Sequence, residues 1–130
     1  MAQKIEILLD TNFLMLPAQH KIDIFSELER ILDFSFELFI IDKSICELDK
    51  IISDAKVKDK IAANVAKQLV KSKGIKIIKT SGEKADDILV DISKGGEFIV
   101  ATADNELKRR LKRNNIKVIT LRKRKYLIMS

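Results

Sequence analysis

The stretch IEILLDTN, residues 5–12, defines the fold class more clearly than any other part of the sequence. Its first five residues are mostly apolar, and the residues that follow, Asp10, Thr11 and Asn12, are polar. A short apolar run that ends in polar, turn-forming residues is typical of a buried strand followed by a turn. The sequence therefore predicts a buried strand that ends directly before Asp10.

Further apolar runs alternate with helical patterns along the rest of the chain. We expect strands over residues 37–41, 75–78, 98–101 and 117–121, and helices over residues 22–32, 42–52, 61–70, 85–93 and 105–114. Pro17 and His20 are expected in a loop. Short apolar strands separated by helices indicate parallel crossovers with helices on both faces of one sheet. The predicted fold is α/β, a three-layer α/β/α sandwich with a central parallel sheet of about five strands.

Length and composition favour one soluble domain. The chain has 130 residues, of which 46% are hydrophobic and 34% charged, and such values are typical of globular proteins. We expect a single domain over residues 1–130 that ends in a basic segment, residues 122–130. The net charge of +6 favours acidic partners, of which nucleic acid is the commonest. The alternative is that the lysines only keep the protein soluble.

Cysteine content and the N-terminal sequence favour a cytoplasmic protein. Cys46 is the only cysteine, so no internal disulfide is possible and a reducing compartment is expected. We expect Cys46 to be buried, because a lone cysteine among apolar neighbours usually is. The first ten residues lack the features of a signal peptide, and no apolar stretch approaches the length of a membrane span. No membrane association is expected.

Acidic residues follow four of the predicted strands. Asp10 follows the first, Glu47 lies early in the helix after the second, Asp86 and Asp87 open the helix after the third, and Asp104 follows the fourth. Ligands of open parallel sheets bind beyond the carboxyl ends of the strands. Carboxylates gathered there repel one another unless a cation joins them. Because all the ligand candidates are carboxylates, the sequence favours Mg²⁺ or Mn²⁺ over Zn²⁺.

Each of these acids also has a purely structural explanation when it is taken alone. Asp104 can cap the helix that it precedes, and Asp86 and Asp87 can complement a helix dipole. Ser44 and Glu47 have the spacing of a capping box. The hypothesis of a metal site therefore rests on the joint position of the acids at one edge of the sheet.

Two groups of basic residues are candidates for binding phosphate groups of a nucleic acid. They are Lys108, Arg109, Arg110, Lys112 and Arg113 in the helix after Asp104, and Arg122, Lys123 and Arg124 after the last predicted strand. If that strand is parallel to the others, the second group emerges at the same edge as the acids. The alternative is an ordinary solvated charge run. Carboxylate-bound Mg²⁺ in a basic protein commonly serves to hydrolyse phosphodiesters.

Four short motifs resemble those of the PIN-domain ribonucleases. They are LDTN at residues 9–12, ICEL at 45–48, ADDILV at 85–90 and VATAD at 100–104. Their order, spacing and structural context agree with the family over nearly the whole chain. The resemblance implies a metal-dependent endoribonuclease, a hydrolase that cleaves single-stranded RNA and leaves a 5′-phosphate and a 3′-hydroxyl.

The resemblance also implies roles for individual residues. Asp10, Glu47, Asp86 and Asp104 correspond to the catalytic acids, and Asp10, Asp86 and Asp104 to the ligands of one or two Mg²⁺ or Mn²⁺ ions. Asn12 and Thr102 correspond to residues that hold the acids in place. The spacing within the family favours Asp86 as the third acid. Asp87 remains the alternative, or a neighbour that tunes the site.

Within this family the chain looks most similar to the PIN proteins that process small-subunit ribosomal RNA, because of residues 85–87 and the basic residues near the C-terminus. VapC-type toxin ribonucleases are the next most similar. The resemblance implies an RNA partner, with precursor rRNA as the first candidate, and is compatible with a homodimer or with an antitoxin partner. A non-catalytic rRNA-binding module for ribosome assembly stays open. A dehalogenase-type phosphatase is disfavoured, because Asn12 stands where it would need a second Asp.

Overall fold

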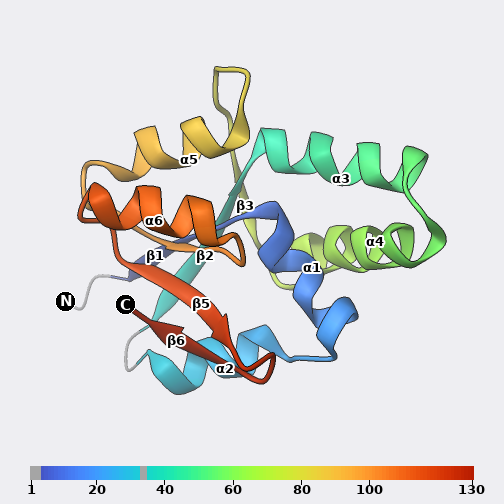
Figure 1. Cartoon of the computed structure of the whole chain (residues 1–130), viewed down its shortest axis with the longest axis horizontal. Helices are drawn as coiled ribbons and strands as arrows, with labels where there is room; N and C mark the ends of the chain where they lie inside the picture. The colour runs from blue at the N-terminus through green and yellow to red at the C-terminus, as the bar shows by residue number, and fades with distance from the viewer. Residues whose placement is uncertain (1–3, 33–34) are drawn as a thin grey trace.

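A central sheet forms the middle layer of the molecule (Figure 1). The computed structural model describes residues 4–32 and 35–130, and within them the sheet has six strands in the order β3-β2-β1-β4-β5-β6. The strands are β1 (Ile5–Leu9), β2 (Phe36–Ile41), β3 (Lys76–Ile78), β4 (Phe98–Ala101), β5 (Val118–Arg122) and β6 (Tyr126–Met129). The first five are parallel, and β6 is antiparallel to β5.

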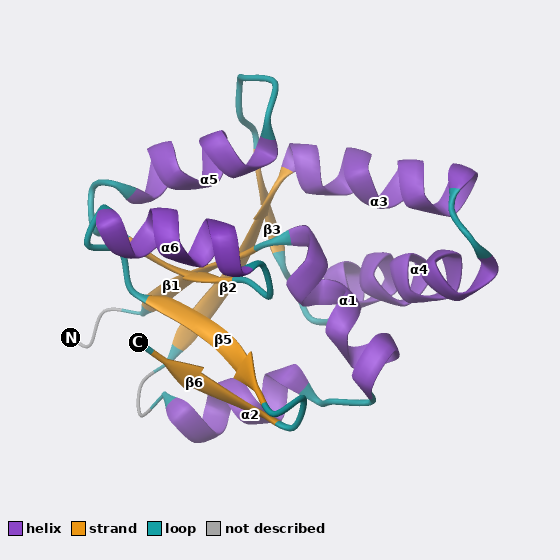
Figure 2. Ribbon diagram, in the orientation of Figure 1, coloured by secondary structure: helices purple, strands orange, loops and turns teal. Residues whose placement is uncertain are grey.

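Helices cover both faces of this sheet (Figure 2). They are α1 (Thr11–His20), α2 (Ile24–Ile31), α3 (Asp42–Asp54), α4 (Val57–Ser72), α5 (Ala85–Ser93) and α6 (Asn105–Arg113). The α/β sandwich with a parallel core is thus confirmed, with one antiparallel strand added at its edge. In the described part of the chain, no helix is both long and apolar enough to span a membrane.

Alternating side chains of β1 supply the two halves of the core. Ile7 and Leu9 belong to the cluster formed with α1 to α4, while Leu8 belongs to the cluster formed with α5 and α6. All three side chains are fully buried. A strand buried on both faces has a continuous apolar sequence, which is why residues 5–9 are so informative.

The strand order reverses between β1 and β4. From β1 the chain first builds β2 and β3 on one side, and then returns to build β4 and β5 on the other. The backbone N–H of Asp10 donates to the carbonyl of Ala101 at 2.9 Å, so the carboxyl ends of β1 and β4 lie side by side. Such a reversal is where open α/β sheets bind their ligands.

The expected loop around Pro17 and His20 is wrong, because these residues lie in α1. Asp10 is the N-cap of this helix, and the helix ends where Lys21 adopts a positive φ of 54°. Proline inside a helix removes one hydrogen bond. The burial of the apolar run at residues 13–16 offsets that loss. An unbroken apolar run has no helical period, so the sequence pattern could not predict this helix.

The basic C-terminal segment also differs from the prediction, because it forms a hairpin rather than a tail. The N–H of Lys125 donates to the carbonyl of Arg122 at 3.1 Å, and the residues between them, Lys123 and Arg124, both have positive φ. This turn leads into β6, where Leu127 is fully buried. Turns of this kind normally carry Asn or Gly, so the Lys-Arg pair gave no hairpin signal.

The expectation that Cys46 is buried is wrong, because its side chain is exposed. Ser44 and Leu48 form the buried face of α3. Cys46 lies two positions from each, or roughly 200° around the helix. Ser44 also forms no capping box with Glu47, since the N-cap of α3 is Ile41 and has no side-chain cap bond.

Candidate active site

Asp10 is a buried carboxylate at the reversal of strand order, and both of its oxygens accept hydrogen bonds. Oδ1 accepts from the backbone N–H of Thr11 at 2.8 Å. Oδ2 accepts from Oγ1 of Thr102 at 2.7 Å. Only 4% of the Asp10 surface is exposed. The side chain is therefore fixed in orientation by β1, α1 and the segment after β4.

Thr102 joins Asp10 to Asp104. Its Oγ1 donates to Asp10 and accepts from the backbone N–H of Asp104 at 3.0 Å. Oδ1 of Asp104 accepts from the N–H groups of Glu106 and Leu107, at 2.8 and 3.1 Å. Asp104 is therefore the N-cap of α6, the structural role that the sequence also allowed. The buried hydroxyl of Thr102 in addition holds its backbone beside Asp10.

Asn12 holds the same segment from the other side. Its Oδ1 accepts from the backbone N–H of Ala103 at 3.1 Å. The first turn of α1 and the residues that precede α6 are thus joined at two points, through Thr102 and through Asn12. A supporting role of both residues in the site stays a prediction.

Glu47 of α3 contacts Thr11, the residue after Asp10, to which the sequence analysis gave no role. Oγ1 of Thr11 donates to Oε1 of Glu47 at 2.6 Å. Thr11 stands next to Asp10, so the hydrogen bond brings α3 close to the first turn of α1. The signal was present in the LDTN motif, but the partner of Thr11 lies 36 positions away in the sequence and no local pattern identifies it.

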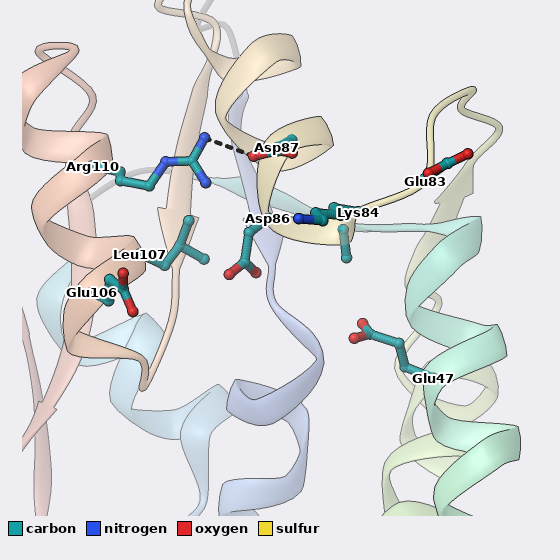
Figure 3. A pocket seen from close by; sticks show the side chains of 9 residues that line it. Glu47, Glu83, Lys84, Asp86, Asp87, Glu106, Leu107 and Arg110 are labelled. Carbon is teal, nitrogen blue, oxygen red and sulfur yellow. Dashed lines mark ion pairs between the residues drawn. The ribbon is translucent and has the colours of Figure 1, made fainter.

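Asp86 and Asp87 point in different directions (Figure 3). Asp86 extends toward the space that Glu47 enters from the opposite side. Asp87 instead forms an ion pair with Arg110 of α6 at 2.9 Å. An open cleft of about 500 Å³ is lined by Glu47, Asp86, Asp87 and Arg110, among other residues. Asp87 thus has an ion-pair partner of its own, and the assignment of Asp86 as the third acid stays a prediction.

The acids influence one another electrostatically. Burial raises the pKa of Asp10 to about 6, and the negative charges of Asp86 and Glu47 add to this rise, while hydrogen bonds from Thr102 and Thr11 oppose it. Burial likewise raises the pKa of Asp86, with further contributions from the charges of Asp104 and Glu47. A site that makes its own carboxylates hard to ionise is one that a cation would stabilise.

The chemistry of these side chains fits a hard divalent cation, since every candidate ligand is a carboxylate oxygen. In the part of the chain that the structure describes, no three His, Cys, Asp or Glu side chains are arranged so that they could hold a metal ion as they stand. Instead, the Thr102 hydroxyl donates to Asp10 and accepts from the backbone N–H of Asp104, and the Thr11 hydroxyl donates to Glu47.

The predicted RNA-binding residues do not form one continuous track. Arg110 faces the acidic cleft, whereas Lys108 and Arg122 line a second groove. The other candidates on α6 and in the turn after β5 are exposed: Arg109, Lys112, Arg113, Lys123 and Arg124. Because β5 is parallel to β4, Arg122 does emerge at the same edge of the sheet as Asp104.

Comparison with known families assigns most of the chain to one family. A family model described as "PIN like domain" matches residues 7–124. The chain belongs to the PIN-domain family. All four motifs that suggested the resemblance lie inside the matched region, as do Asp10, Glu47, Asp86 and Asp104.

Two ribonucleases and one solved structure resemble this chain over most of its length. Ribonuclease VapC4 of Methanocaldococcus jannaschii is 40% identical over 124 residues, which are 93% of each chain. Ribonuclease VapC9 of Archaeoglobus fulgidus is 33% identical over 110 residues, covering 84% of this chain and 77% of that protein. The solved structure of the PIN domain endonuclease Utp24 superimposes with a TM-score of 0.77 at 25% identity, over 96% of this chain and 90% of the other.

Proposed function

We propose that this protein is a metal-dependent endoribonuclease that hydrolyses phosphodiester bonds in single-stranded RNA. The observation that carries the proposal is the buried Asp10 carboxylate at the reversal of strand order, whose pKa burial and the charges of Asp86 and Glu47 raise to about 6, with Thr102 bonded to both Asp10 and the backbone of Asp104. Membership of the PIN family supports the reaction class. The names of its relatives support RNA as the substrate.

In this proposal, Asp10, Asp86 and Asp104 hold one or two Mg²⁺ or Mn²⁺ ions. A bound divalent ion supplies positive charge to the phosphate and makes nearby water more acidic. Thr102 holds the Asp10 carboxylate and the Asp104 backbone through its hydroxyl, and the first N–H groups of α6 hold the Asp104 carboxylate, so that two of the ligands are pre-oriented. Asn12 holds the intervening backbone at Ala103.

Glu47 orients the attacking water. Its Oε1 is occupied by the hydroxyl of Thr11, so Oε2 is the atom that accepts the water proton. The water oxygen forms a bond to phosphorus as the bond from phosphorus to the 3′ oxygen breaks. The 3′ oxygen leaves and takes up a proton from solvent water, which gives a 3′-hydroxyl, and the phosphate stays on the 5′ end of the other fragment. Arg110 lines the cleft and pairs with Asp87 through Nη2, and its remaining N–H groups bind a phosphate oxygen.

Single substitutions of the acids test this proposal. We expect Asp10→Asn, Glu47→Gln and Asp86→Asn each to lower the rate of Mn²⁺-dependent cleavage of a labelled single-stranded RNA by ~100-fold or more, because even residues that only support metal ligands contribute about 10- to 100-fold. Asp87→Asn should lose less than Asp86→Asn. Asp49→Asn on α3 is the matched control, because Asp49 pairs with Lys67 away from the cleft.

A second readout does not depend on turnover. Mn²⁺ should raise the thermal unfolding midpoint of the wild-type chain more than that of Asp10→Asn, because a ligand stabilises only the state that binds it. Full cleavage activity in Asp10→Asn, or cleavage by the wild type that persists in chelator, would rule out the proposed mechanism.

For the natural RNA we propose precursor rRNA, on the strength of the basic residues near the C-terminus. A VapC-type role, with an antitoxin partner and a homodimer, is the second candidate, and the names of the two curated relatives favour it. Crosslinking of the Asp10→Asn variant in cells distinguishes the two. Recovery of precursor rRNA supports processing, whereas recovery of tRNA or mRNA supports the VapC-type role.

A further inference from the structure

A second groove lies on the far side of α6 from the acidic cleft. It has a volume of about 270 Å³ and is formed by the end of α1, the first turns of α6 and the end of β5. His20, Lys108 and Arg122 contribute one basic side chain from each of these elements. None of the three is adjacent to another in sequence, and no pattern in the sequence connects His20 to the other two.

This groove is basic and lacks a compensating acid. Its lining contains no Asp or Glu, whereas the lining of the acidic cleft contains five, Glu47, Glu83, Asp86, Asp87 and Glu106. Among residues 4–32 and 35–130, the ion pairs that the structure contains involve none of the three basic groove residues. Lys108 and Arg122 carry positive charge and have no acidic partner in the groove lining, so an anion bound between them would be stabilised.

The groove is next to the acidic site. Ala103 and Asn105, the residues on either side of Asp104, both line it. The first turns of α6 separate the two hollows, since Glu106 and Arg110 line the acidic cleft while Asn105 and Lys108 line the groove. A strand that crosses the beginning of α6 would therefore contact both.

We propose that this groove binds backbone phosphates of the RNA strand on one side of the bond that is cleaved. The inference rests on the proposed function and adds a substrate-binding subsite to it. Its volume is below the roughly 300–1,000 Å³ of a typical small-molecule site, so it suits a phosphate with its sugar rather than a duplex. Leu16, Leu121 and Ile128 give the groove an apolar wall against which the sugar can pack.

Binding of RNA in the absence of cleavage tests the subsite. A fluorescent 12-nucleotide single-stranded RNA is titrated with the full chain carrying Asp10→Asn, in chelator. Adding Lys108→Ala and Arg122→Ala should weaken binding ~10-fold or more. The two changes should also reduce the dependence of log K on log salt concentration by about one per lost phosphate contact. His20→Ala is measured in the same way and should weaken binding in the same direction.

A matched control removes the same charge from elsewhere. Lys117→Ala with Lys125→Ala lowers the net charge equally, and both lysines are exposed and lie outside the groove. This pair should change binding less than about twofold. An equal loss in the control and the groove variants would show that only net charge matters, and would overturn the subsite. Absence of RNA binding by the parent chain would overturn it as well.

Two further arms keep the result interpretable. If Lys108→Ala with Arg122→Ala unfolds at a lower temperature than the parent, the Gln pair at the same positions replaces it. Competition with a mononucleotide distinguishes a site that binds free phosphate compounds from a site that binds an RNA strand. Competition by the mononucleotide at the concentration of the 12-mer would overturn the strand assignment. Because the experiment measures RNA binding and not cleavage, it tests the subsite even if the protein proves to have no nuclease activity.

Discussion

The charge of Asp10 has a cost for the folded protein, because its carboxylate is buried and faces Glu47 of α3 and Asp86 of α5. Its pKa of about 6 lies above its ordinary value of 3.8. The folded state therefore binds the proton more readily than the unfolded state. Asp10 contributes its full stability below pH ~4, and this contribution is lost as the pH rises through ~6.

We expect Asp10→Asn to stabilise the metal-free protein at neutral pH. Each pKa unit corresponds to about 1.4 kcal/mol, so ionisation of Asp10 costs the folded state about 3 kcal/mol. In urea unfolding with chelator at pH 7.5, the variant should exceed the wild type in free energy of unfolding by up to that amount. The difference should shrink toward zero near pH 4. A difference of the same size at both pH values would contradict this account.

A helix or strand is predicted correctly from the sequence where its local residue pattern matches the way it packs in the folded protein. The bounds predicted for α5 and β4, residues 85–93 and 98–101, coincide with the structure. They do so because α5 shows a clear apolar face and β4 is short, apolar and buried. The sequence analysis missed α1 and β6, because an unbroken apolar run and a Lys-Arg turn carry no local signal. Contacts with distant segments decide both elements.

One of these distant contacts covers the free edge of β6. Leu127 pairs with β5 on one side. On the other side, its N–H donates to Oε1 of Glu27 at 2.9 Å and its carbonyl accepts from Nη2 of Arg30 at 2.9 Å. Glu27 and Arg30 also form an ion pair across one turn of α2. Side chains of a helix thus occupy backbone groups that an edge strand would otherwise expose to another chain.

We expect Glu27→Ala to weaken the packing of α2 on β6. Loss of a hydrogen bond to a charged group should reduce the free energy of unfolding by about 1–2 kcal/mol. Interactions with Arg30 and with the Leu127 N–H lower the pKa of Glu27, so the loss should be present at neutral pH and fade as the pH falls below ~4. Hydrogen exchange at Leu127 should become faster. Glu29→Ala, at the exposed neighbouring position, is the control, and an equal effect there would refute the role of Glu27.

At the scale of the whole molecule, the sheet topology explains why the acids could be predicted and their connections could not. Parallel strands bring Asp10 and Asp104 to one edge, and this follows from counting strand ends. The hydrogen bond from Thr11 to Glu47 and the position of His20 in the groove depend on how helices pack. These details involve segments far apart in sequence, on which a single sequence carries no information.

Another hydrogen-bonded contact between distant segments joins the two sides of the acidic cleft. Asp42, the first residue of α3, accepts hydrogen bonds from both the hydroxyl and the backbone N–H of Thr80. Thr80 follows β3 and precedes the loop to α5. The contact therefore joins the helix that carries Glu47 to the segment that leads to Asp86. Neither Asp42 nor Thr80 lines the cleft, so their effect on the acids is one of position.

We expect Asp42→Ala and Thr80→Val each to lower the kcat of RNA cleavage about 3- to 10-fold, with little change in KM, because small displacements of catalytic groups reduce rate more than binding. The double variant should be no slower than the slower single variant, since both remove the same contact. Rescue by Thr80→Ser, which keeps the hydroxyl, separates positioning from loss of packing. Multiplicative losses in the double variant would instead mean that the two residues act independently, and that the spacing of Glu47 and Asp86 is set by the sheet alone.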